Sequence, residues 1–184
     1  MNLYMTAAIL AITASSAAMA QDTAPDGTDA FGIEPYVGVL AGYHNFDRRN
    51  PDFPALPAPG RMDGALVGGV AGINLPLGPV FVGVEGNASK GFNDIDWEYG
   101  ARGRLGLRAG ESGMIYASAG RQWINGKRGF ANRNDWIYGM GFEVGPKDIG
   151  LAGVTGNSGI RLRLQMDTYD GHSLRPMGGV IFHF

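Results

Sequence analysis

The sequence of 184 residues contains no cysteine. This absence excludes a disulfide framework, a thiolate metal site and a lipidated anchor cysteine. Positive charge is not in excess, because the formal net charge is −2, and nothing indicates a nucleic-acid-binding surface. The only histidines are His44, His172 and His183, and their spacing predicts no metal site. No cofactor is expected.

Long apolar runs are also missing. Beyond residue 20 the chain has no stretch of 18 consecutive apolar residues, so no transmembrane helix is predicted there. The mean hydropathy of −0.06 is that of an ordinary soluble protein. A membrane barrel reaches the same average, because its lipid-facing and lumen-facing residues cancel. The abundant residue is glycine, with 31 copies scattered through the apolar stretches.

The first 20 residues differ from the rest of the chain. Residues 7–20 carry no charge and end in Ala18-Met19-Ala20, which matches the small-residue pattern of a signal-peptide cleavage site. We expect a secretory signal peptide over residues 1–20, cleaved after Ala20. The first five residues lack Lys and Arg, which is atypical. An uncleaved anchor is the alternative, although the run is shorter than the roughly 20 residues that span a bilayer. Residues 21–33 are expected to form a flexible N-terminal segment.

From residue 34 onward, apolar residues alternate with small or polar residues in segments of about ten, separated by turn signals. A period of two is typical of half-buried strands. We predict eight strands, over residues 35–44, 63–74, 80–89, 96–108, 114–123, 135–144, 159–169 and 175–184. The stretch from Gly145 to Ser158 is longer than a tight turn and is the least regular connector.

The two faces of each predicted strand differ in polarity. In the fourth strand Trp97, Tyr99 and Leu105 share one face, and Glu98 and Arg102 share the other. A soluble sandwich or lipocalin-like carrier would turn the apolar face inward, whereas an outer-membrane barrel turns it outward to lipid. Two features favour the barrel. Short and long connectors alternate, and aromatic residues lie near strand ends as interfacial girdles require: Tyr36, Tyr43, Trp97, Tyr99, Trp123, Trp136, Tyr138, Phe182 and Phe184.

The predicted fold is therefore all-β: an eight-stranded antiparallel transmembrane β-barrel with an up-and-down meander, over residues 34–184. Four segments resemble the OmpA/OmpX-like, opacity-type outer-membrane barrel family, namely Tyr36–Val39, Tyr116–Gly120, Gly139–Glu143 and Gly178–Phe184. The resemblance implies a Gram-negative cell envelope and a monomer. It also implies that the barrel-assembly machinery reads a C-terminal signal at Val180, Phe182 and Phe184.

Charged residues on the polar faces are expected to share the lumen. They are Glu85, Glu98, Arg102, Arg104, Glu143, Arg161, Arg163 and Asp167. An eight-stranded barrel is only wide enough for side chains to fill, so these charges must pair. Four acids balance four arginines, which favours a plugged lumen; the alternative is a narrow pore for small solutes or ions. Arg108 is expected near the periplasmic rim.

Catalytic residues are not predicted. Asp170, His172 and Ser173 raise the alternative of a lipid A-modifying enzyme, but neighbours on a strand point to opposite faces and a loop turn explains them better. Asp94 and Asp96 lack the glycine and distal glutamate of a calcium loop.

Basic residues in the predicted outer loops could bind lipopolysaccharide phosphates. They are Arg48, Arg49, Lys90, Lys127, Arg128 and Arg133. The first outer loop, from Asn45 to Met62, also holds four prolines, which resist strand pairing. The sequence therefore predicts a non-enzymatic outer-membrane protein with a structural or surface-interaction role. Its partners are outer-membrane lipid and lipopolysaccharide, with no nucleic acid.

Overall fold

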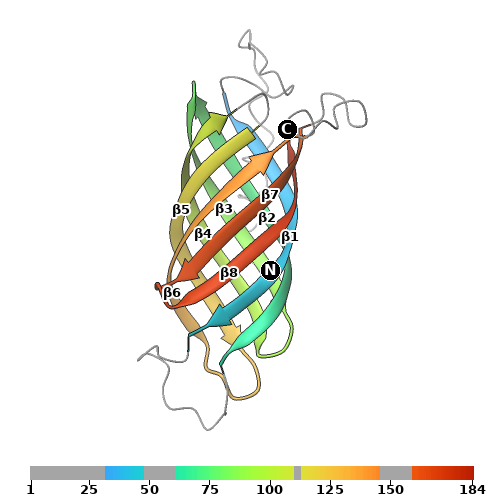
Figure 1. Ribbon diagram of the computed structural model, residues 1–184, viewed down its shortest axis with the longest axis vertical. Coiled ribbons are helices and arrows are strands. Elements are labelled where there is room, and N and C mark those ends of the chain that lie inside the picture. The colour runs from blue at the N-terminus through green and yellow to red at the C-terminus, as the bar shows by residue number, and fades with distance from the viewer. Residues whose placement is uncertain (1–31, 48–60, 110–112, 146–158) are drawn as a thin grey trace, which may run out of the picture.

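The computed structural model describes residues 32–47, 61–109, 113–145 and 159–184. They form a closed barrel of eight antiparallel strands in sequence order, with β1 paired to both β2 and β8 (Figure 1). The strands are β1 (Glu34–Phe46), β2 (Asp63–Leu77), β3 (Val80–Gly91), β4 (Ile95–Ala109), β5 (Gly113–Gly126), β6 (Arg133–Val144), β7 (Ile160–Tyr169) and β8 (Ser173–His183).

The predicted architecture is confirmed, and each of the eight predicted strands overlaps one observed strand. Most observed strands are longer than predicted by one to three residues at an end, because the chain stays paired beyond the last clear apolar–polar alternation. The barrel closes where β8 runs beside β1, with Val39 opposite Val180.

The two ends of the barrel differ in their connectors. We call the end that carries the β2–β3 turn and Phe184 the turn end, and the end that carries the β3–β4, β5–β6 and β7–β8 connectors the loop end (Figure 1). The β2–β3 turn is short because Gly78 adopts a φ of +73°, a left-handed conformation that glycine tolerates without steric penalty.

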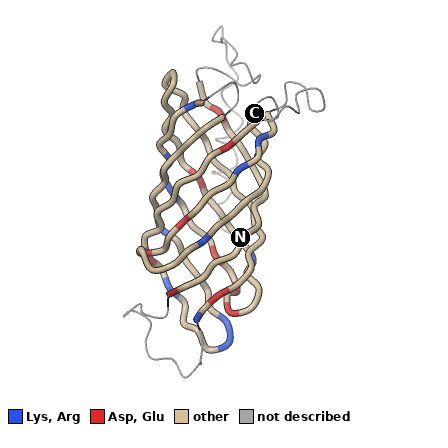
Figure 2. The backbone as a smooth tube through the Cα atoms, in the orientation of Figure 1, with Lys and Arg blue, Asp and Glu red and all other residues tan. Residues whose placement is uncertain are grey.

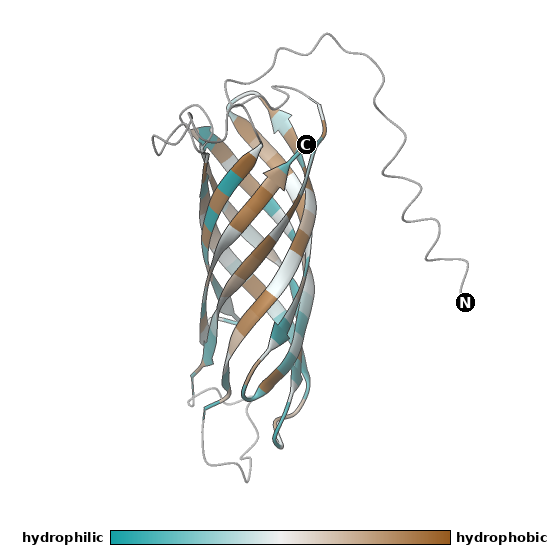
Figure 3. Cartoon of the chain, turned by 90° about the vertical axis from the view of Figure 1, so that its right-hand side faces the viewer, coloured by the Kyte–Doolittle hydropathy of each residue, from teal (hydrophilic) through white to brown (hydrophobic). Residues whose placement is uncertain are grey.

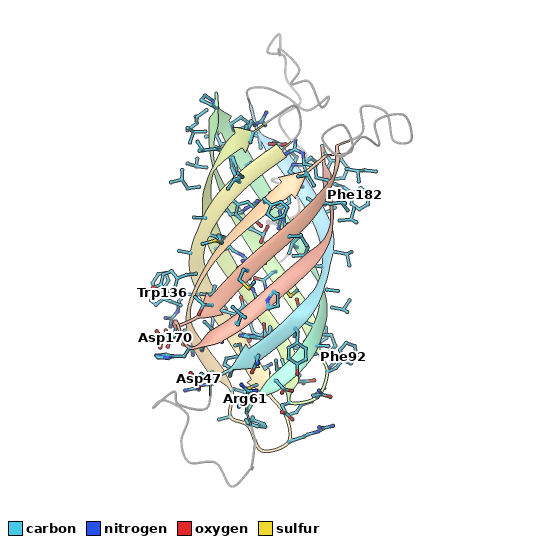
Figure 4. All side chains as sticks on the ribbon, viewed as in Figure 1. Asp47, Arg61, Phe92, Trp136, Asp170 and Phe182 are labelled. Carbon is cyan, nitrogen blue, oxygen red and sulfur yellow. The ribbon has the colours of Figure 1, made fainter. Side chains whose placement is uncertain are left out.

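The exterior of the barrel is apolar. Outward side chains such as Val84 and Met140 are 63% and 69% exposed. Figure 3 shows the apolar residues in brown along the strands. Trp136 and Phe182 point away from the barrel in Figure 4. A polar interior inside an apolar exterior is the arrangement of a transmembrane barrel. No helix in the described ranges is long and apolar enough to cross a membrane.

Many glycines face the lumen, where they make room for larger side chains. A Cβ atom on Gly139 would lie 2.0 Å from Oδ1 of Asp167, and one on Gly72 would lie 2.3 Å from the Tyr36 hydroxyl. The glycine abundance therefore has a packing cause: a large inward side chain fits where the residue beside it on the next strand is a glycine, which has no side chain.

The lumen also contains an apolar layer, which the sequence pattern does not reveal. At the loop end, Phe46, Met62, Ile95, Ile124 and Tyr169 are buried in one cluster. At the turn end, a smaller cluster joins Phe81, Met114 and Tyr116. Apolar side chains therefore fill the loop end of the lumen, and the turn end holds both apolar and charged side chains.

Several sequence predictions lie outside the described residues. These are the signal peptide over residues 1–20 with its cleavage after Ala20, most of the 21–33 segment, the proline-rich part of the first outer loop, Arg48 and Arg49, and most of the 145–158 connector.

Candidate functional site: the charged lumen

A chain of ion pairs and hydrogen bonds runs along the inside of the barrel. Charged residues of both signs are spread over the length of the strands (Figure 2). Five carboxylates and five arginines are buried among the described residues: Glu34, Glu85, Glu98, Glu143 and Asp167, with Arg102, Arg104, Arg161, Arg163 and Arg175. Their charges balance, as burial in a medium of low dielectric constant requires.

The turn-end part of this chain of ion pairs centres on Glu34. Its Oε2 accepts a hydrogen bond from Arg108 at 2.9 Å, and its Oε1 lies 3.3 Å from Arg161 Nη2. His183 Nδ1 lies 2.9 Å from the same Oε1 atom. The other ring nitrogen of His183, Nε2, lies 2.8 Å from Glu143, so this histidine links the turn-end group to the middle of the lumen.

The middle of the lumen holds the densest group. Glu143 Oε1 accepts from Arg104 at 2.7 Å and from Arg163 Nε at 3.0 Å. Arg163 also donates to Oε2 of Glu85, over 2.5 Å. The Tyr36 hydroxyl donates to the same Glu85 oxygen at 2.8 Å and accepts from Arg104 at 2.6 Å. Each carboxylate here is held by at least two donors, so no charge in this group is left alone.

In the loop-end half of the lumen, the central acid is Asp167. It accepts from Arg102 at 3.0 Å and from Arg175 Nη2 at 2.7 Å. Arg175 Nη1 also donates to Glu98 at 2.8 Å, and Glu98 in turn lies 2.5 Å from Nδ1 of His44. This series of ion pairs and hydrogen bonds ends at Ser173, whose Oγ lies 2.9 Å from His44 Nε2.

The structure places all eight sequence-predicted lumen residues inside the barrel and within this chain of ion pairs. Arg108 lies at the turn end, with 16% of its side chain exposed. Sequence reasoning missed Glu34, His44, Arg175 and His183. Their inward phase on strands β1 and β8 was the available signal, because each alternates with outward apolar neighbours.

Ser173 bonds to His44 and not to the adjacent His172. Both His172 and Gly171 are exposed on the β7–β8 connector. The structure therefore does not bring together the cluster considered from sequence, Asp170 with His172 and Ser173. A different histidine, 129 positions away in the chain, meets the serine instead.

The exposed cations gather at the loop end. Lys90 and Lys127 both contact Oδ1 of Asp96, at 2.5 Å and 3.1 Å, and the Lys90 ammonium lies 4.9 Å from the ring centroid of Trp97. Arg128 lies 3.7 Å from Asp94. Arg133 begins β6 at the same end.

The residues of the expected assembly signal lie on the outer face of β8. Phe182 and Phe184 are 40% and 70% exposed, and Val180 is partly exposed. The Phe184 amide donates to the Pro35 carbonyl at 2.9 Å, which ties the end of the chain to β1. Tyr36 corrects one expectation: its ring points into the lumen and does not join the aromatic girdle, because its hydroxyl is held between Glu85 and Arg104. Within the described ranges, no group of His, Asp and Glu side chains is arranged to hold a metal ion.

Comparisons with known proteins give structural neighbours alone. No family model and no curated protein matches the chain. Neisserial surface protein A aligns at 12% identity over 83% of this chain and 99% of its own, with a TM-score of 0.48. The attachment invasion locus protein of Yersinia pestis, in complex with the heparin analogue sucrose octasulfate, aligns at 14% identity over 82% and 99%, with a TM-score of 0.47. A designed transmembrane β-barrel aligns at 11% identity over 83% and 96%, with a TM-score of 0.48.

Proposed function

We propose that the chain is an outer-membrane barrel of the OmpA/OmpX-like, opacity-type family that has a structural or surface-interaction role in a Gram-negative cell envelope. The apolar exterior and the pairing of β1 with β8 support insertion as a closed monomer. The signal peptide over residues 1–20 would direct export, and Val180, Phe182 and Phe184 would be read by the barrel-assembly machinery. The loop end would face the outside of the cell.

The filled lumen is the observation that carries this proposal. The large side chains of Arg163 and Arg175 are fully buried in the lumen, and apolar side chains such as Phe46 and Tyr169 are buried with them toward the loop end. An eight-stranded barrel has no spare width beyond its own side chains. The interior therefore serves as a packed, ion-paired core, and the working surface is the outside of the barrel and its loops.

The loop-end cations support a contact with lipopolysaccharide. Lys90 and Lys127 share the single carboxylate of Asp96, so this cluster carries surplus positive charge. Trp97, beside Lys90, is the kind of residue that lies at a membrane–water interface. Phosphate groups of the outer leaflet would meet the two ammonium groups at that level.

Single-channel recording tests the structural role against a narrow pore. The protein is refolded, its folding is checked by a heat-dependent gel shift, and it is inserted into a planar bilayer. We expect folded protein without stable current. Discrete, reproducible openings would instead show a water-filled path through the ion-pair chain, and the pore alternative would replace the structural role.

A further inference from the structure

Three side chains from three different strands meet in the loop-end half of the lumen, in an order that suits ester hydrolysis. Ser173 Oγ lies 2.9 Å from His44 Nε2, and His44 Nδ1 lies 2.5 Å from Oε1 of Glu98. We propose that Ser173, His44 and Glu98 form a nucleophile–base–acid triad that hydrolyses carboxylic esters at the loop end. This activity goes beyond the envelope role proposed above and departs from the sequence-based expectation of a non-enzymatic protein.

The hydrogen-bond partners determine where the protons lie. An ionised carboxylate only accepts, so His44 Nδ1 carries the proton that faces Glu98, and in the neutral imidazole Nε2 is left as an acceptor. Ser173 Oγ already accepts a hydrogen bond from the Tyr169 amide, at 2.8 Å. Its own proton is therefore directed to His44 Nε2. A hydroxyl that donates to a base, which a third group orients, is the arrangement of an activated nucleophile.

The base is held rigidly. Arg175 donates to the second oxygen of Glu98 at 2.8 Å and is itself fixed by Asp167 at 2.7 Å. The side chains of His44 and Glu98 are completely buried, and the Phe46 ring centroid lies 4.0 Å from that of His44. Burial strengthens the electrostatic contact between the carboxylate and an imidazolium that forms during the reaction.

Ser173 is the most exposed member of the triad. Ser173 begins β8 directly after the exposed residues Gly171 and His172, and it is partly exposed while His44 behind it is not. Figure 4 shows Asp170, in the same connector, at the outer edge of the barrel toward the loop end. Two aromatic residues with ring centroids 5.8 Å apart adjoin the triad: the Phe46 ring contacts His44, and the Tyr169 amide donates to Ser173. These apolar neighbours favour an ester with an apolar acyl group.

The reaction balances with water as the only co-reactant. Ser173 Oγ bonds to the ester carbonyl carbon while its proton passes to His44 Nε2. His44 then gives this proton to the leaving alcohol as the C–O bond breaks, which leaves an acyl group on Ser173. Water attacks the acyl carbon, passes a proton to His44, and the carboxylic acid leaves as the proton returns to Ser173 Oγ. Glu98 stays ionised throughout and stabilises the imidazolium.

The test uses the refolded full barrel in detergent, with p-nitrophenyl butyrate and a fluorophosphonate probe. We expect the probe to attach to Ser173, located by peptide mass mapping, and the S173A variant to lose about 100-fold or more of the esterase rate. S118A removes another lumen serine and should keep both labelling and rate. Folded wild-type protein that is not labelled at Ser173, or an S173A rate equal to wild type, would overturn the proposal. The labelling needs no variant, so it decides the matter even if S173A does not fold.

Two further measurements sharpen the result. Glu98 is a positioning residue, so E98Q should lower kcat by at least about tenfold and leave KM unchanged, whereas a purely structural loss would affect folding or KM as well. Phosphatidylglycerol vesicles separate the two possible sources of ester. Fatty-acid release from them would identify an ester-linked lipid, and hydrolysis confined to p-nitrophenyl butyrate would identify a small soluble ester.

Discussion

Arg104 and Glu143 meet inside the lumen, with 2.7 Å between Nη2 and Oε1, although β5 separates their strands. Such a contact cannot come from strand pairing and depends on the diameter of the closed barrel. Arg163 reaches the same Glu143 oxygen from β7. The ion pairs therefore link strands through the interior, in addition to the hydrogen bonds that link them around the wall.

Removal of Arg163 should destabilise the barrel strongly. Arg163→Ala leaves Glu85 and Glu143 with fewer partners in a fully buried position. Breaking a buried ion pair from one side costs about 3–5 kcal/mol, because the remaining charge is uncompensated. The unfolding midpoint in urea, measured on the refolded protein in detergent micelles, should fall accordingly.

Arg128→Ala is the matched control for this change. Its guanidinium lies 3.7 Å from Asp94 with 69% of the side chain exposed, so water replaces the lost contact. The midpoint should stay at the wild-type value. Equal midpoints for wild type and Arg163→Ala would show that the lumen charges are hydrated and contribute little.

The direction in which a glycine faces should decide whether it tolerates a methyl group. A Cβ atom on the inward Gly120 would lie 2.1 Å from the Ala101 carbonyl oxygen and 2.5 Å from Cα of Arg102, both backbone atoms. Gly120→Ala should therefore cost about 1–3 kcal/mol through overpacking. The outward Gly103 has no atom closer than 3.9 Å to such a Cβ, and Gly103→Ala should leave the urea midpoint unchanged. Similar midpoints for both variants would contradict the packing role of the lumen glycines.

The exposed Phe184 should matter for assembly more than for stability. Its ring is 70% exposed, so Phe184→Ala removes little packing within the barrel. We expect less folded protein in outer membranes of expressing cells, measured by heat-dependent gel shift, and an unchanged urea midpoint after refolding in vitro. Leu174→Ala, an exposed apolar side chain at the start of β8, is the control and should assemble normally. Equal amounts of folded Phe184→Ala and wild type would exclude a role in the assembly signal.

Substitutions around Asp96 should change lipopolysaccharide affinity in opposite directions. Asp96→Asn releases Lys90 and Lys127 from their shared carboxylate and should strengthen binding. The double variant K90Q/K127Q should weaken it by about tenfold, because two charge-assisted hydrogen bonds to phosphate are lost. Binding to immobilised lipopolysaccharide at two salt concentrations measures both effects. The same affinity for all three proteins would remove this cluster from the contact.

The fold was predictable because the strand pattern is local. Strands β4 and β7 alternate apolar and charged residues almost without interruption. Once a soluble sandwich or carrier is set aside, this alternation places the apolar face outside the barrel and the charged face inside it. The strand ends were less predictable. At the start of β4 the register shifts between Ile95 and Trp97, so Ile95 turns inward where simple alternation would not place it. The inward position of Ile95 was missed for this reason.

The lumen site was only half predictable. Charges within a regular strand, such as Arg161 and Arg163, could be assigned inward from their phase alone. His44 and His183 looked isolated, because the contacts that use them join β1 to β4 and β8 to β6. Such partners depend on the tilt and diameter of the closed barrel. No spacing along the chain encodes them.

The pairing of β1 with β8 has a consequence for the order of events during folding. These strands are the first and the last of the barrel, with Tyr36 opposite His183. Until residue 183 is in place, both strands expose unsatisfied backbone edges that can pair with other chains. A partly delivered chain therefore has no stable closed form. Until β8 pairs with β1, these open edges leave the protein prone to pair with other copies, and the ring of strands closes only when its last strand is in place.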